Sequence, residues 1–80
     1  MNLQILFFGI TTDLLETSSI ELTITEHSTV AHLKTALTDA YPSLKKLESY
    51  AVAVNETYAT DTVILKENDV IAIIPPVSGG

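Results

Sequence analysis

The sequence IELTITEHSTVAHLKTALTDAY, residues 20–41, changes its apolar period midway. From Ile20 to Ile24 apolar and polar residues alternate, which is typical of a half-buried strand. Beyond Ser28, a good N-cap residue, apolar residues recur at offsets of three and four and form one stripe on a helix. They are Val30, Leu33, Leu37 and Tyr41. Pro42 ends this helix, because the residue before a proline disfavours helical angles. The stretch therefore predicts a strand followed by an amphipathic helix.

The rest of the chain is divided by turn-forming residues. Residues rich in β-formers stop at Gly9, and the mostly polar stretch from Thr11 to Ser19 is typical of a loop that includes one helical turn. Turns are expected at 55–56 and 68–69. We predict strands at 2–8, 50–54, 57–60 and 70–74, and a second short helical turn at 43–48.

The predicted order is strand, strand, helix, strand, strand, strand. This order favours an α+β fold with a mixed sheet of about five strands packed on one main helix, which is the β-grasp (ubiquitin-like) plan. The first and last strands are the most apolar, so we expect them to pair at the centre. We expect one domain over residues 1–74 and an extended C-terminal tail over residues 75–80.

Composition restricts the function classes. The chain has 80 residues, four Lys, no Arg and ten acidic residues, giving a net charge of −6, and it contains no Cys. An acidic surface disfavours nucleic acid and anionic membranes. Lack of Cys excludes a disulfide framework, a thiolate zinc site and a cysteine nucleophile. Because we find neither a signal peptide nor a membrane span, we expect a soluble cytoplasmic protein.

The uncovered face of the sheet is predicted to be unusually apolar. One helix covers one face only, and alternation assigns one set of side chains to the helix side. That set is Leu3, Ile5, Phe7, Ile20, Leu22, Ile24, Ile71 and Ile73. Leu6, Phe8, Ala72 and Ile74 would then face outward. Two readings remain: a protein partner on this face, or apolar side chains that are merely exposed.

The last six residues form a distinctive ending, Pro75-Pro76-Val77-Ser78-Gly79-Gly80. Two prolines favour an extended exit, and the tip carries small side chains or none, so it could enter a narrow tunnel in another protein. Its reactive group is the α-carboxylate of Gly80, which becomes an acyl donor only after activation. The chain has no Gly-rich phosphate loop and no Arg, so another enzyme must activate it. A frayed terminus is the plain alternative.

These residues resemble the small subunit of molybdopterin synthase, a ubiquitin-like sulfur carrier. The resemblance runs nearly end to end. It rests on Leu6-Phe7-Phe8, Val54-Asn55-Glu56-Thr57, Glu67-Asn68-Asp69-Val70 and above all the Pro-Pro-Val-Ser-Gly-Gly ending. Thiamine-pathway sulfur carriers lack the double proline, and ubiquitin-type modifiers carry arginines in the corresponding tail.

The resemblance implies a chemical role for the tail. An E1-like enzyme would adenylate Gly80 with ATP and Mg²⁺, and a sulfur donor protein would allow its conversion to a thiocarboxylate. The tail of Pro75, Pro76, Val77, Ser78 and Gly79 would insert into the large synthase subunit. There the sulfur would pass to precursor Z, cyclic pyranopterin monophosphate, to build the molybdopterin dithiolene. The chain would bind no cofactor itself, would not be catalytic alone, and would belong to a heterotetramer. Leu6, Phe8 and Ile74 would lie at the subunit interface.

Other functions remain open. Gly80 could be joined to a lysine of a target protein, the chain could serve a thiamine-type pathway, or the domain could be an interaction module with an idle tail. We expect no metal site, because His27 and His32 are five residues apart and have no third ligand nearby.

Overall fold

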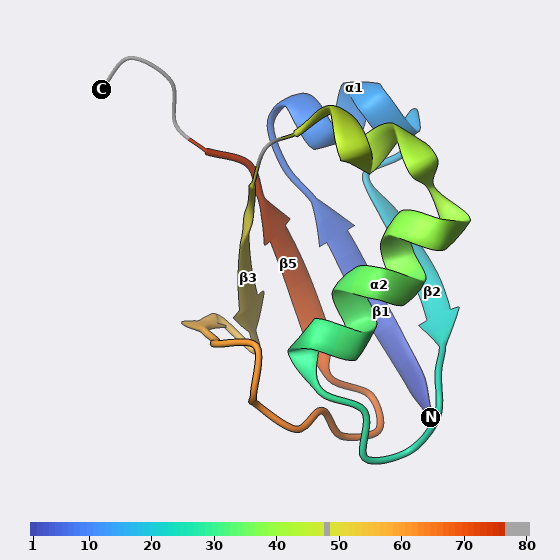
Figure 1. Ribbon diagram of the computed structural model, residues 1–80, viewed down its shortest axis with the longest axis vertical. Helices are drawn as coiled ribbons and strands as arrows, with labels where there is room; N and C mark the ends of the chain where they lie inside the picture. Colours follow the sequence, from blue (N-terminus) through green and yellow to red (C-terminus); the bar gives the residue numbers. More distant parts are fainter. Residues whose placement is uncertain (48, 77–80) are drawn as a thin grey trace.

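The computed structural model describes residues 1–47 and 49–76 of the chain (Figure 1). The elements, in chain order, are β1 (Asn2–Phe7), α1 (Ile10–Leu15), β2 (Ser19–Thr23), α2 (Val30–Ala40), the 3₁₀ helix η1 (Pro42–Lys46), β3 (Ala51–Val54), β4 (Thr57–Tyr58) and β5 (Val70–Ile74). Among these residues no helix is long and apolar enough to cross a membrane.

Within the described residues, the strands form one five-stranded sheet in the order β2-β1-β5-β3-β4. The first and last strands pair at its centre in parallel, as predicted, and the other pairs are antiparallel. The helix α2 lies across one face of the sheet, while α1 and η1 lie together at one end (Figure 1). The expected α+β, β-grasp architecture is confirmed.

The core lies between the sheet and α2, and its members confirm the predicted helix-facing side. Leu3, Ile5, Phe7, Ile71 and Ile73 are buried against Val30, Leu33 and Leu37 of α2. Ile20, Leu22 and Ile24 are half-buried and pack on the same cluster. Burial of these side chains is the main favourable contribution to folding, at about 1.5–3 kcal/mol for each large side chain.

The structure corrects the predicted bounds of several elements. The first helical segment is longer than one turn and ends at Glu16, whose φ is 56°. The strand expected at 57–60 is shorter, because Thr60 already accepts a turn hydrogen bond from the Val63 N–H (3.2 Å). The second helical turn is η1, and Glu48 lies outside the described residues.

The N-cap of α2 is Thr29 and not Ser28, as the sequence led us to expect. The Thr29 hydroxyl accepts from the His32 N–H (3.4 Å), and His32 Nδ1 accepts from the Thr29 N–H (3.3 Å), which completes a capping box. Ser28 is buried, and its hydroxyl donates to the Thr25 carbonyl (2.6 Å). Both residues are good caps, so the sequence could not choose between them.

Hydrogen bonds between polar groups join residues 54–57 to residues 67–70 at the start of β5. Both segments belong to the resemblance described above. Asn55 and Glu56 both have positive φ (49° and 71°), as the tight β3–β4 hairpin requires. The Asn55 amide donates to Asp69 Oδ1 (2.9 Å), and its carbonyl oxygen accepts from the Val70 N–H (3.0 Å). Asp69 Oδ2 accepts from the Lys66 N–H (2.8 Å). These hydrogen bonds therefore hold the start of β5 against the β3–β4 turn.

Candidate functional site

The tail begins at the end of the central strand β5. Ile74 pairs with Ala51, Pro75 is half-buried and Pro76 is exposed. The end of β5 lies at the same end of the sheet as α1 and η1 (Figure 1). The predictions for Val77, Ser78, Gly79 and Gly80 fall outside the described residues and stay predictions.

Pro75 lies against Gly9, at the end of β1. A Cβ atom added to Gly9 would lie 3.1 Å from Cγ of Pro75, and Gly9 has a positive φ of 56°. Both features favour glycine, which has no Cβ and adopts positive φ readily. The first tail residue is held by the domain.

Phe8 is held next to this contact by the buried Thr11. The Thr11 hydroxyl accepts from the Phe8 N–H (3.0 Å) and donates to the Phe8 carbonyl, so it satisfies both main-chain groups of Phe8. The strand therefore ends at Phe7, and Phe8 remains 48% exposed. Sequence analysis missed this role of Thr11, because the hydroxyl acts only once α1 turns back on β1.

The open face carries the predicted outward side chains in one register. Leu6 pairs with Ala72, Ala72 with Ala53, and Ala53 with Tyr58, so these side chains form a row across four strands. Leu6, Ala72 and Ile74 are half-buried, whereas Tyr58 is 72% exposed. The helices cover the opposite face. The register thus places Leu6 and Ile74 on the open face, as predicted, and Phe8 follows β1 as an exposed side chain.

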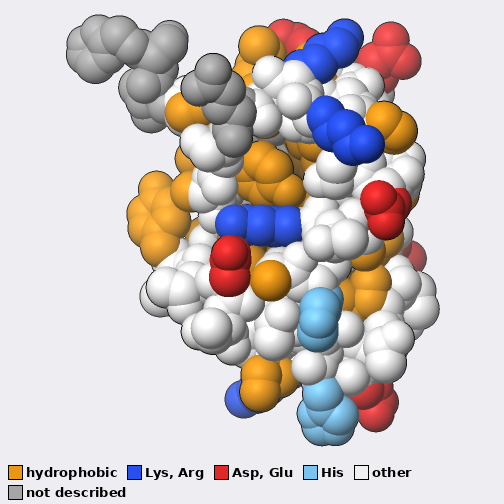
Figure 2. Space-filling model, in the orientation of Figure 1, with side chains coloured by type: hydrophobic (Ala, Val, Ile, Leu, Met, Phe, Trp, Pro, Cys, Tyr) orange, Lys and Arg blue, Asp and Glu red, His pale blue; other side chains and the backbone are white. Residues whose placement is uncertain are grey.

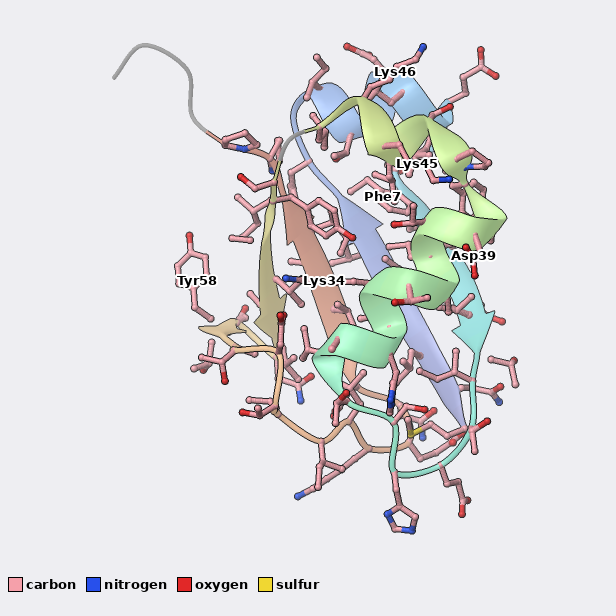
Figure 3. All side chains as sticks on the ribbon, in the orientation of Figure 1. Phe7, Lys34, Asp39, Lys45, Lys46 and Tyr58 are labelled. Carbon is pink, nitrogen blue, oxygen red and sulfur yellow. The ribbon has the colours of Figure 1, made fainter. Side chains whose placement is uncertain are left out.

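A hollow of about 410 Å³ continues this apolar surface to the base of the tail. Its walls include Ile74, Pro75 and Pro76 on one side and Ala51 and Tyr58 on the other. Tyr58 projects away from the domain beyond β3 (Figure 3). A partner that held the tail could therefore contact the domain at the same time.

The histidines do not form a metal site in the described part of the chain. No group of three His, Cys, Asp or Glu side chains that could hold a metal ion occurs among residues 1–47 and 49–76. His32 already accepts a hydrogen bond from Thr29 through Nδ1. Its role here is to cap α2.

The fold and the tail exit define a ubiquitin-like β-grasp protein with an apolar open face. A family model described as the ThiS family matches residues 5–80, so the chain belongs to the ThiS family. The chain is 35% identical to a molybdopterin synthase sulfur carrier subunit of Arabidopsis thaliana, over 100% of this chain and 84% of that protein.

Solved structures share the fold of this chain. SAMP1 from Haloferax volcanii has the same fold, with a TM-score of 0.89 and 21% identity over 100% of both chains. A chain of the protein–protein complex of subunits 1 and 2 of molybdopterin-converting factor from Helicobacter pylori 26695 is 27% identical, with a TM-score of 0.72 and full coverage of both chains.

Proposed function

We propose that this chain is the sulfur carrier subunit of molybdopterin synthase. The observation that carries the proposal is that the Pro-Pro-Val-Ser-Gly-Gly sequence follows the central strand β5, whose last residue, Ile74, lies on the apolar open face. The name of the Arabidopsis relative, which matches the whole of this chain, supports it. So does the Helicobacter complex, in which a similar chain is bound to a second subunit.

The chemistry that we propose takes place at the carboxylate of Gly80. A carboxylate oxygen attacks the α-phosphate of ATP on an E1-like enzyme, with Mg²⁺ as the metal, and pyrophosphate leaves. Sulfur at the oxidation level of sulfide, supplied by a donor protein, then attacks the acyl carbon and AMP leaves. The product is a thiocarboxylate. In the large subunit the thiocarboxylate sulfur attacks a carbon of precursor Z and displaces its oxygen substituent, and water then cleaves the acyl–sulfur bond and restores the Gly80 carboxylate. Two such transfers build the dithiolene.

The domain contributes positioning to this chemistry. Pro75 is held against Gly9, so the direction in which the tail leaves is set before a partner binds. A preset direction lowers the conformational entropy lost on binding. Leu6, Phe8 and Ile74 form the surface on which we propose that the large subunit docks. An apolar patch beside the reactive tail is the kind of surface that such a partner would bury.

The experiment that tests the proposal is mass spectrometry of the protein purified from its native cells while they make molybdenum cofactor. Trypsin cleavage after Lys66 releases Glu67 to Gly80 as one peptide. We expect this peptide to have one oxygen replaced by sulfur. Using the peptide avoids confusion with oxidation of Met1, and a variant lacking Gly80 is the matched control.

Other outcomes would overturn the proposal. An unmodified carboxylate under these conditions would reject the sulfur carrier. An isopeptide bond between Gly80 and a lysine of another protein would identify a modifier instead. Sulfur on Gly80 with no transfer to precursor Z by the large subunit would indicate a carrier of another pathway.

A further inference from the structure

The outer edge of β2 presents main-chain groups that its own sheet does not use. β2 is an edge strand, and the other edge, β4, has only two residues among those described. The bonds from the Phe7 N–H to the Ser18 carbonyl (2.9 Å) and from the Ile24 N–H to the Met1 carbonyl (3.0 Å) set the register of the β1–β2 pair. In an antiparallel pair alternate residues face the neighbour. The N–H and C=O groups of Ser19, Glu21 and Thr23 therefore point away from β1.

The free part of this edge is centred on Glu21 and Thr23. The Thr17 hydroxyl accepts from the Ser19 N–H (3.4 Å) and donates to the Ser19 carbonyl (2.9 Å). Both outward main-chain groups of Ser19 are therefore already hydrogen-bonded. Across the described ranges, no hydrogen bond reaches the outward main-chain groups of Glu21 or Thr23. Two donors and two acceptors in one row are a template for an added strand.

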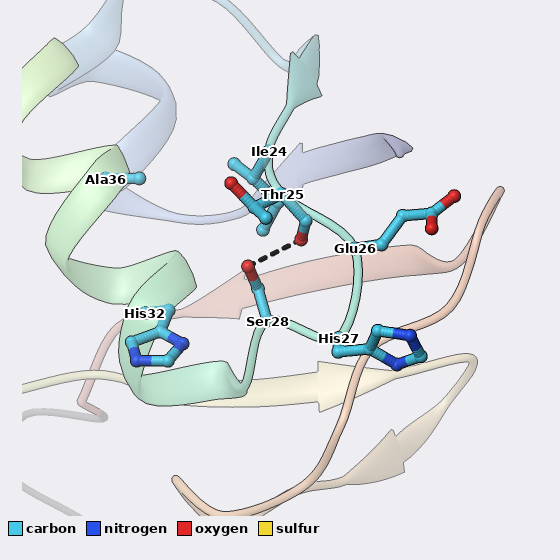
Figure 4. A pocket seen from close by; sticks show the side chains of 7 residues that line it. All are labelled: Ile24, Thr25, Glu26, His27, Ser28, His32 and Ala36. Carbon is cyan, nitrogen blue, oxygen red and sulfur yellow. Dashed lines mark hydrogen bonds between the residues drawn. The ribbon is translucent and has the colours of Figure 1, made fainter.

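Half-buried apolar side chains border the edge on the α2 side of the sheet. Every second side chain of an added strand would lie next to Ile20 and Leu22, which are half-buried there. A hollow of about 460 Å³ lies past the end of β2, between α2 and the loop after the strand (Figure 4). Ile24 and Ala36 line it together with polar side chains of the loop and of α2. Apolar side chains at alternate positions of an added strand would therefore meet Ile20 and Leu22.

The charges around the edge are acidic. Glu21 is on the strand, Glu26 is in the loop, and Asp39 is on the side of α2 that faces β2 (Figure 3). Below the η1 end, the charged side chains along the β2 side of the molecule are acidic (Figure 2).

Most of the lysines lie elsewhere. Lys34 is on the β3 side of α2, where it pairs with Asp61 (2.8 Å) and lies over the Tyr50 ring. Lys45 and Lys46 are in η1. Lys66 lines a hollow together with Met1 and Glu26, and the Met1 ammonium donates to the Ile24 carbonyl (2.8 Å), so positive charge lies near the loop after β2. The charged side chain on the strand itself is Glu21, and it is acidic.

We infer that the outer edge of β2 binds an extended segment of a partner protein in which apolar residues alternate with lysine or arginine. The segment adds as a sixth strand, its apolar side chains pack beside Ile20 and Leu22, and its basic side chains lie beside Glu21. A second copy of this chain does not fit, because pairing β2 with β2 would bring two acidic edges together. The inference does not depend on the tail or on the proposed sulfur chemistry.

The test uses the full-length protein and a short synthetic peptide in which lysine and valine alternate, with both ends blocked. Amide hydrogen exchange and chemical shifts are measured by NMR. We expect the amides of Glu21 and Thr23 to exchange more slowly with the peptide, and shifts to change along β2 and at Ala36. A peptide of the same composition, with its lysines and valines in separate blocks, should bind about tenfold more weakly. Such a peptide can place valines beside Ile20 and Leu22 or lysines beside Glu21, but not both in one register.

Charge-reversal variants separate strand addition from general attraction. Glu21→Lys should weaken peptide binding about fivefold or more. Glu56→Lys makes the same change in net charge at the exposed β3–β4 turn and should change affinity much less. Deletion of Gly80 should change nothing. Unaltered exchange at Glu21 and Thr23, shifts confined to the face of Leu6, Phe8 and Ile74, equal affinity for both peptides, or equal weakening by the two reversals would overturn the inference.

Discussion

Pro75 rests on the main chain of Gly9, and this contact joins the first residue of the tail to the end of the neighbouring central strand. Both residues follow the ends of parallel strands, β1 and β5, in which Phe7 pairs with Ile73. Pro75, the first residue after β5, thus lies against the end of β1.

We predict that Gly9→Ala destabilises the domain by about 1–2 kcal/mol, because φ is positive there and the new Cβ would press on Pro75. Urea unfolding measures this loss. The variant Pro75→Ala removes the ring from the contact, so the double variant should lose less than the sum of the two single changes, by about 0.5 kcal/mol or more. Strictly additive losses would show that the contact with Pro75 does not matter.

The hydroxyl of Thr11 is expected to be essential for the end of β1. Thr11→Val keeps the shape but leaves the Phe8 N–H without its partner, while the Phe8 carbonyl keeps the bond from the Thr11 N–H (3.2 Å), so we expect a loss of about 1–3 kcal/mol in the free energy of unfolding. Thr11→Ser keeps the hydroxyl and serves as the control, with a smaller loss. Equal stability of the Val and Ser variants would contradict the role that we assign to this hydroxyl.

A charge on the open face should weaken binding of the large subunit and leave the fold nearly unchanged. We predict that Phe8→Asp, at a side chain that is 48% exposed, lowers affinity about tenfold or more in calorimetric titration. Ile64→Asp changes a side chain of similar exposure, 57%, away from the open face and is the matched control. Severe unfolding of Phe8→Asp would mean that this side chain belongs to the core. An equal loss of affinity in both variants would show that the interface does not lie on the open face.

Deletion of Gly80 should abolish sulfur transfer without loss of stability. The deletion moves the carboxylate back by one residue, about 3.5 Å, so the activating enzyme no longer meets it in register. Ser78→Ala leaves the terminal carboxylate in place and should retain activity. We would measure thiocarboxylate formation together with thermal unfolding. Full activity of the deleted chain would reject the carrier function.

Local patterns predicted the elements of this fold well, because each depends on periodicity within a few residues. The alternation from Ile20 to Ile24 and the stripe from Val30 to Tyr41 assign one face of a strand and one face of a helix without knowledge of any partner. The same alternation predicted that Leu6 and Ile74 face outward, and the structure places them on the open face. The tail was identified by its composition alone.

Other features could not be predicted, because they depend on residues that meet only after folding. The choice of Thr29 over Ser28 as N-cap follows from the position of Thr25, whose carbonyl takes the Ser28 hydroxyl. The helix α1 has weak periodicity, and it forms where Thr11 closes on Phe8.

The sequence by itself determined the order of the strands and helices, the split between core and open face, and the chemistry available at Gly80, since these depend on side-chain type and local spacing. Only the tertiary structure decided which main-chain groups stay unpaired at the edge of β2 and where the tail is held. Gly9 and Pro75 are far apart in sequence, and they touch because parallel pairing of β1 and β5 brings the ends of both strands together.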